Sequence, residues 1–221
     1  MNKTIIKVWA LLAAFVVPTA LAVADDLVPP PWVRGSALTT TQEWDFLSPT
    51  DIFGQPINGH GNPYGQPRVV NPADGVWLPN DSSFNPAPTT RPGIVCLAPG
   101  VTLRFLIPNL EIPGNQKNVW AQVTWWAAPG TNVVVSPIAP APNSGTIIGT
   151  IPLAGGWNHT TASFVLAQQP AWEEFWIQNL TNSNLYLDQV VIDTQCVPEP
   201  ATLAALALGG SLLARRRRIK K

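Results

Sequence analysis

The sequence NVWAQVTWWA, residues 118–127, places apolar residues at every second position. Because successive side chains of a β-strand point to opposite faces, this period of two predicts a half-buried strand. Its aliphatic face consists of Val119, Ala121 and Val123. Its other face consists of Trp120, Gln122, Thr124 and Trp126.

Other β-branched or aromatic runs, each bounded by Gly, Pro or Asn, predict further strands. They lie at residues 39–46, 68–71, 75–78, 101–107, 132–135, 146–151, 160–166, 173–179 and 185–194. The segment 54–93 is rich in Pro, Asn and Gly, which is turn chemistry, so strands there are short. No long apolar stripe at helical spacing occurs between residues 25 and 196. The fold class predicted for this region is therefore all-β, a jelly-roll-like β-sandwich.

The first 24 residues predict a cleavable signal helix. Lysines 3 and 7 precede an apolar stretch, and small residues at 22 and 24 precede two acids. A positive start, an apolar run and a small-x-small site are typical of a secretion signal. A buried first helix is the alternative interpretation.

The other end of the chain, residues 197–221, combines three features. It begins with Val197, Pro198, Glu199 and Pro200 and continues as an apolar run over residues 201–214. A basic cluster follows, Arg215, Arg216, Arg217 and Arg218. The 14 apolar residues are fewer than the roughly 20 that a helix needs to cross a typical bilayer, so we expect a short transmembrane helix in the inner membrane. The cations favour a cytoplasmic end.

This combination resembles the PEP-CTERM sorting domain of Gram-negative, biofilm-forming bacteria. The resemblance implies recognition by an exosortase-type membrane transpeptidase and an association with extracellular polysaccharide. A simple membrane anchor with a proline-containing stalk is the alternative.

Between these ends, residues 25–196 suffice for one extracytoplasmic domain. They hold five cations and twelve acids, a net charge of −7, and no basic motif, so we do not expect nucleic acid as a partner. The only cysteines, Cys96 and Cys196, reach a compartment that permits disulfides, which predicts one bridge between them. Two unpaired thiols are the alternative. No cluster has metal-ligand spacing, and we expect no metal or cofactor.

A second resemblance involves residues 172–178 and 185–193. These stretches look like the two final strands of jelly-roll carbohydrate-binding and galactose-binding-like modules. The resemblance implies a fold and supplies no ligand.

Nine tryptophans between residues 25 and 196 exceed what a core of this size requires. If Phe175 and Ile177 point inward, Trp172 and Trp176 point outward around Glu174. Flat rings beside carboxylates and amides are suited to stacking on sugars. The hypothesis is a glycan platform on one sheet formed by Trp120, Trp126, Trp172, Glu174 and Trp176. Packing beneath the Pro-rich segment is the alternative.

We expect no enzyme and no catalytic residues. Glu173 and Glu174 are strand neighbours and so point to opposite faces, whereas a glycosidase needs two facing carboxyl groups. Two functions therefore remain, a structural or biofilm-related protein of the cell surface and a carbohydrate-binding module displayed there.

Overall fold

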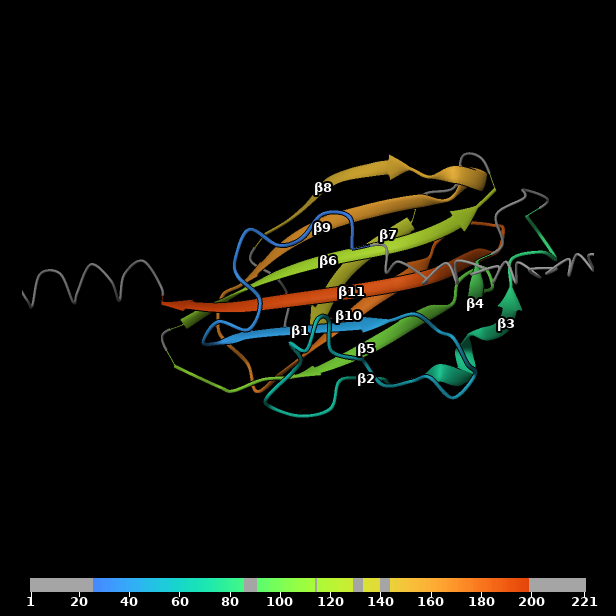
Figure 1. Ribbon diagram of the computed structural model, residues 1–221. Helices are drawn as coiled ribbons and strands as arrows, with labels where there is room; N and C mark the ends of the chain where they lie inside the picture. The colour runs from blue at the N-terminus through green and yellow to red at the C-terminus, as the bar shows by residue number, and fades with distance from the viewer. Residues whose placement is uncertain (1–25, 86–90, 114, 129–132, 140–143, 199–221) are drawn as a thin grey trace, which may run out of the picture.

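The computed structural model describes residues 26–85, 91–113, 115–128, 133–139 and 144–198 (Figure 1). Within these residues the chain is a sandwich of two antiparallel sheets, with two short 3-10 turns at Pro72–Asp74 and Ala154–Gly156. The strands are β1 Thr39–Trp44, β2 Arg68–Val69, β3 Val76–Asn80, β4 Pro92–Leu97, β5 Thr102–Pro108, β6 Asn115–Ala127, β7 Val133–Ala139, β8 Ser144–Pro152, β9 Asn158–Leu166, β10 Trp172–Asn179 and β11 Leu185–Pro198.

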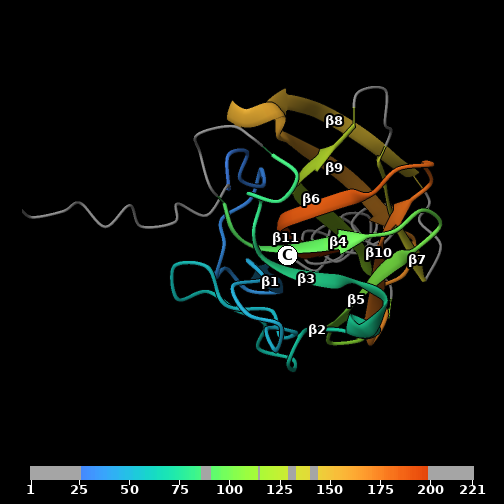
Figure 2. The same cartoon turned by 90° about the vertical axis from the view of Figure 1, so that its right-hand side faces the viewer.

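The larger sheet has seven strands in the order β3-β4-β11-β6-β9-β8, with β1 also paired to β11. The smaller sheet has four, in the order β2-β5-β10-β7. Strand β11 lies in the middle of the larger sheet and pairs with β6 from Leu185 opposite Ala127 to Pro198 opposite Asn115. Its other edge pairs first with β4 and then with β1. Figure 2, which views the molecule along the strands, shows the two sheets as facing layers.

The core fills the space between the sheets with the inward face of each strand. Phe105 and Phe175 from the smaller sheet meet Trp44 and Phe164 from the larger one, and their rings pack edge to face or tilted. Full burial of each large apolar side chain contributes about 1.5–3 kcal/mol to folding. The inward faces predicted from alternation are confirmed in both β6 and β10.

The predicted strands all appear, with ends shifted by a few residues. One strand, β4, was missed, because Pro92 and Gly93 at its start are turn residues. Gly93 has a positive φ of 69°, and a side chain there would meet the backbone of Phe46 and Leu47. The glycine is therefore required for β4 to begin against this segment.

The structure does not describe the residues of the two predicted helices. The signal helix at residues 1–24 and the short transmembrane helix within residues 197–221 lie outside the described residues. Among those that are described, no helix has the length and apolarity needed to cross a membrane.

The predicted disulfide is wrong. Cys96 and Cys196 are both free. Cys96 stands opposite Tyr186 in the register of β4 and β11, and Cys196 lies ten residues further along β11. At ~3.3 Å per residue that separation is about 33 Å, whereas a disulfide needs Cα atoms within about 7 Å. Cysteine count and compartment carry no information about register, which is what keeps the two thiols apart.

Candidate functional site

Strand β11 leads directly into the predicted sorting segment. Its last two residues, Val197 and Pro198, pair with Gln116 and Asn115 of β6, and Pro198 is exposed. The remaining predicted sorting residues lie outside the described part of the chain: Glu199, Pro200, Arg215, Arg216, Arg217 and Arg218. The folded domain thus extends to the first proline of the Pro-Glu-Pro sequence without an intervening linker.

The four tryptophans of the predicted platform are divided between the two sheets. Trp120 and Trp126 belong to β6 of the larger sheet, and Trp172 and Trp176 belong to β10 of the smaller one. All four residues lie on the faces of their strands that point away from the core, as alternation predicted. Because β6 and β10 belong to different sheets, these faces lie on opposite sides of the sandwich. The prediction that they share the surface of one sheet is therefore wrong.

The outer face of the larger sheet is covered by residues 26–34, which we call the N-terminal strap. The Val28 backbone N–H donates to Gln122 Oε1 at 2.9 Å, and the Trp120 indole donates to the Val28 carbonyl at 2.8 Å. Gln122 also donates to Asp26 Oδ1 at 2.6 Å. His159 lies beneath, with its ring nitrogens 3.1 Å from Gln122 Oε1 and 3.0 Å from the Thr124 hydroxyl. These polar side chains are buried and hydrogen-bonded, as burial requires.

Arg34 fixes the end of the strap with two carboxylates. Its guanidinium donates to both oxygens of Asp193 on β11, at 2.7 and 2.6 Å, and also to Asp26. The Thr41 hydroxyl of β1 donates to the same Asp193 carboxylate. Burial alone would lower the pKa of Arg34, but Asp26 and Asp193 raise it, so the guanidinium stays charged. Although burial opposes the effect, Arg34 and Gln122 lower the pKa of Asp26.

Trp126 lies in an aromatic cluster with Phe84, Tyr186 and Trp157. Phe84 stacks on Tyr186 with ring centroids 3.6 Å apart, and its centroid lies 5.1 Å from that of Trp126. The Arg91 guanidinium lies over the Trp157 ring at 5.1 Å. Such ring pairs are worth about 0.5–1.5 kcal/mol beyond area burial. Trp120 and Trp126 are thus engaged in packing.

The outer face of the smaller sheet is more open. Trp172 is 48% exposed at one end of β10. Two residues on, Glu174 Oε1 lies 3.2 Å from Arg104 Nη1 of β5, and the Arg104 guanidinium in turn lies over the Trp176 ring at 6.0 Å. The Trp176 indole nitrogen is buried and has no hydrogen-bond partner within the described structure. Arg104 was not predicted as a site residue, although alternation along residues 101–107 places it on this face.

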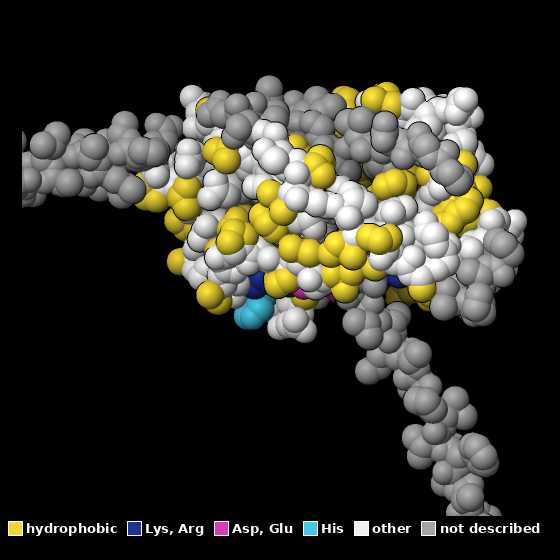
Figure 3. All heavy atoms as spheres, turned by 90° about the horizontal axis from the view of Figure 1, so that it is seen from above, with side chains coloured by type: hydrophobic (Ala, Val, Ile, Leu, Met, Phe, Trp, Pro, Cys, Tyr) yellow, Lys and Arg dark blue, Asp and Glu magenta, His cyan; other side chains and the backbone are white. Residues whose placement is uncertain are grey.

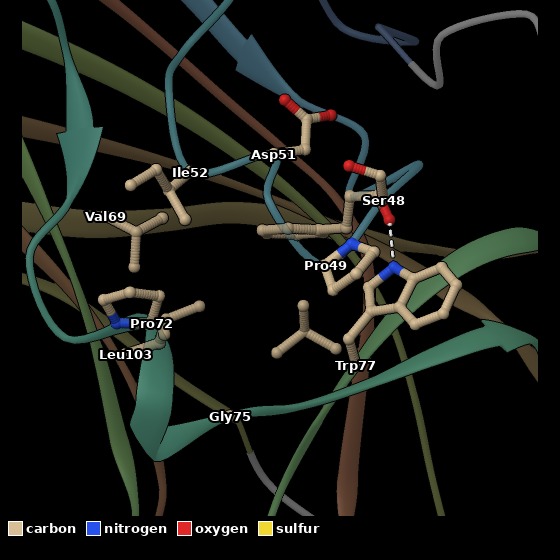
Figure 4. Close-up of a pocket in the computed structure, with 11 residues that line it drawn as sticks. Ser48, Pro49, Asp51, Ile52, Val69, Pro72, Gly75, Trp77 and Leu103 are labelled. Carbon is tan, nitrogen blue, oxygen red and sulfur yellow. Dashed lines mark hydrogen bonds between the residues drawn. The ribbon is translucent and has the colours of Figure 1, made fainter.

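The pocket in Figure 4 is too small for a sugar. Ile52, Val69 and Leu103 form one wall, and Trp77 faces them, with its indole N–H donating to the Phe46 carbonyl at 2.7 Å. The cavity measures about 40 Å³, which is room for water, whereas ligand pockets measure about 300–1,000 Å³. In the described part of the chain no group of three His, Cys, Asp or Glu side chains is arranged to hold a metal ion.

Apolar side chains are exposed along the edge strand β8. Ile147, Ile148 and Ile151 each expose between two fifths and just over half of their surface. Figure 3, which views the molecule from the β8 side, shows hydrophobic and uncharged side chains there with few charged ones.

Comparison with known proteins identifies the C-terminal segment. Residues 197–218 match the family model described as the PEP-CTERM protein-sorting motif. No curated protein matches the chain. The matched residues begin at Val197, the penultimate residue of β11, and end at Arg218. The chain is therefore an exported surface protein that carries a PEP-CTERM sorting motif, the signal that an exosortase processes.

Proposed function

We propose that the β-sandwich is a structural, biofilm-related component of the cell surface or extracellular matrix. The observation that carries this proposal is the direct continuation of β11 into the sorting motif at residues 197–218. A load applied through the anchor would enter a central strand held by β6 on one edge and by β1 and β4 on the other. Such a strand resists extraction better than an edge strand, because its backbone bonds must break on both sides.

A non-catalytic role fits the carboxylates. Glu173 points into the core and Glu174 points out, so they cannot face one substrate. Asp188 and Asp193 form ion pairs with Arg91 and Arg34. Along the chain, strands β4, β5, β6 and β7 alternate between the two sheets, which then have the orders β4-β11-β6-β9 and β5-β10-β7. This strand order supports the jelly-roll assignment for the domain.

Sorting is tested in the native host with an epitope tag after Lys221 and an antibody against the folded domain. We expect the mature protein to keep the domain signal and lose the tag. The variant Glu199→Ala, which removes the carboxylate between the two prolines, should retain the tag in the membrane fraction. A mature wild-type protein that carries both signals would identify an ordinary membrane anchor.

Carbohydrate binding is the second candidate function, supported by the exposed Trp172 on the smaller sheet. Trp172, Glu174 and Trp176 stand on one face with Arg104, which combines apolar rings with hydrogen-bonding groups. Trp120 and Trp126 lie on the other side of the sandwich and are no longer part of this candidate surface.

The test is binding of the host's own extracellular polysaccharide to the full-length exported protein. Trp172→Ala should weaken binding by up to about tenfold, because a ring contact of this kind is worth about 0.5–1.5 kcal/mol. Trp120→Ala is the matched control and should leave the affinity unchanged. Absence of binding by the wild type, or equal losses in both variants, would exclude a glycan site around Trp172.

A further inference from the structure

A charged cluster lies inside the sandwich, at the end where β11 leaves toward the sorting motif. Lys117, on the inward face of β6, is 0% exposed. Glu173, on the inward face of β10, is 1% exposed, and Asn109, which follows β5, is 8% exposed. Lysine and glutamate are almost never this buried unless they are paired. None of the three residues belongs to the sorting motif at residues 197–218 or to the outer face that carries Trp172.

The three side chains form a closed triangle. The Lys117 amine donates to Asn109 Oδ1, and the Asn109 amide nitrogen donates to Glu173 Oε2. Lys117 Nζ lies 3.5 Å from the same Glu173 oxygen. The amine therefore stands beside the Asn109 carboxamide group, with a carboxyl group in contact with the nitrogen that would have to leave.

The surroundings hold this geometry and exclude water. The Asn109 backbone N–H donates to the Ala171 carbonyl at 2.8 Å, which ties the residue to the chain just before β10. Glu173 Oε1 is buried and has no hydrogen-bond partner within the described residues. Cys196, opposite Lys117 in the register of β11 and β6, is buried beside it.

Burial makes the charged form of Glu173 less favourable. Burial raises the pKa of Glu173 to about 7, although Lys117 acts to lower it. A buried ion pair must repay the desolvation of both charges, so burial lowers the cost of passing one proton from the ammonium to the carboxylate. The product is a neutral amine, which is nucleophilic, next to a protonated acid.

We propose that Lys117 and Asn109 become joined by an intramolecular isopeptide bond, with Glu173 as the proton-transfer group. The inference does not depend on sorting or on glycan binding, since all three residues belong to the folded domain.

The reaction balances without an oxidant, a reductant or a cofactor. Glu173 takes a proton from Nζ, and the freed lone pair attacks Cγ of Asn109. The acid then protonates Nδ2, the Cγ–Nδ2 bond breaks, and ammonia leaves as the Nζ–Cγ amide forms. Of the three ammonium protons of lysine, one stays on the new amide, one leaves with ammonia and one remains on Glu173. The charges of the ion pair are removed, and a neutral acid is left beside a neutral amide.

The bond would join the two sheets covalently. Asn109 follows the last residue of β5 in the smaller sheet, and Lys117 lies in β6 of the larger sheet. Lys117 is also opposite Cys196, two residues before Pro198. The cross-link would therefore close the sandwich next to the point where the anchor is attached.

Mass spectrometry of the purified, denatured mature protein tests the proposal. We expect the wild type to be lighter than its unmodified sequence by one ammonia molecule, with a branched peptide linking residues 109 and 117. Glu173→Gln, which keeps the shape but cannot accept the proton, should have the full mass. Glu174→Gln, on the outer face of the same strand, is the matched control and should keep the loss.

The wild-type peptide map decides the question even if Glu173→Gln fails to fold. Recovery of Lys117 and Asn109 in separate linear peptides at their full masses would overturn the proposal and leave an ordinary buried ion pair. Loss of one ammonia mapped to any other pair of residues would overturn it as well.

Discussion

The two outer faces of the sandwich carry nearly the same sequence pattern and have different surroundings. On β6, Trp120 and Trp126 flank Gln122 and Thr124, and the N-terminal strap and the aromatic cluster cover them. On β10, Trp172 and Trp176 flank Glu174, and nothing in the described structure covers Trp172 to the same degree. Alternation within a strand thus determines which face a side chain occupies. It does not determine what packs on that face.

The largest expected effect comes from releasing the strap. Arg34→Ala leaves the fully buried Asp193 carboxylate without its cation, and breaking a buried ion pair costs about 3–5 kcal/mol. Denaturant unfolding of the full-length protein measures the loss. Arg104→Ala on the open face is the control and should cost less than about 1 kcal/mol, because its ion pair with Glu174 is partly exposed. Equal losses would show that the two faces do not differ in burial.

A smaller loss of stability is expected when a tryptophan of either outer face is replaced. Trp120→Ala removes a packed ring and its hydrogen bond to the Val28 carbonyl, which should cost about 2–3 kcal/mol. Trp172→Ala removes a ring that is half in solvent and should cost about 1 kcal/mol or less. Thermal unfolding of the two variants compares them. A Trp172 variant that loses as much as the Trp120 variant would make Trp172 a packing residue.

The smallest effect is a pH dependence of folding stability, which arises on the covered side of the sandwich. Burial, reinforced by Asp45 and Asp26, raises the pKa of Glu43 to about 7 from the 4.5 of an unperturbed glutamate. The unfolded chain therefore releases this proton at lower pH than the folded protein does, and Glu43 destabilises the fold progressively as the pH rises from 4.5 to about 7.

Glu43→Gln removes this titration and should be more stable than the wild type above pH 7. Because Glu43 is only half-buried, solvent screening keeps the gain near the order of 1 kcal/mol. The free energy of unfolding measured at several pH values checks it. A difference between variant and wild type that stays constant with pH would mean that Glu43 ionises normally.

What the sequence could predict was local. The strands, their inward faces and the sorting motif each depend on residues within a short window, and all of these except strand β4 were predicted. The partner of each strand was not, because pairing such as that of β11 with β6 joins residues about 70 positions apart. The false disulfide and the false four-tryptophan platform both follow from that missing register.

Two functional features were missed for a related reason. The strap has no regular secondary structure, so periodicity gives no signal for residues 26–34. The predicted strand at 118–127 began one residue after Lys117, although extending the alternation would have placed that lysine on the inward face with Val119. A lysine in phase with core residues is the signal that sequence reasoning should have used.

Delivery of this domain to the surface by its C-terminal motif can be checked by sequencing the C-terminal peptide of the mature protein by mass spectrometry. We expect a chain that ends close to the Pro198-Glu199-Pro200 sequence and lacks the Arg215–Arg218 cluster. Recovery of an intact C-terminal peptide that extends through Arg218 to Lys221 on the surface-exposed protein would contradict it.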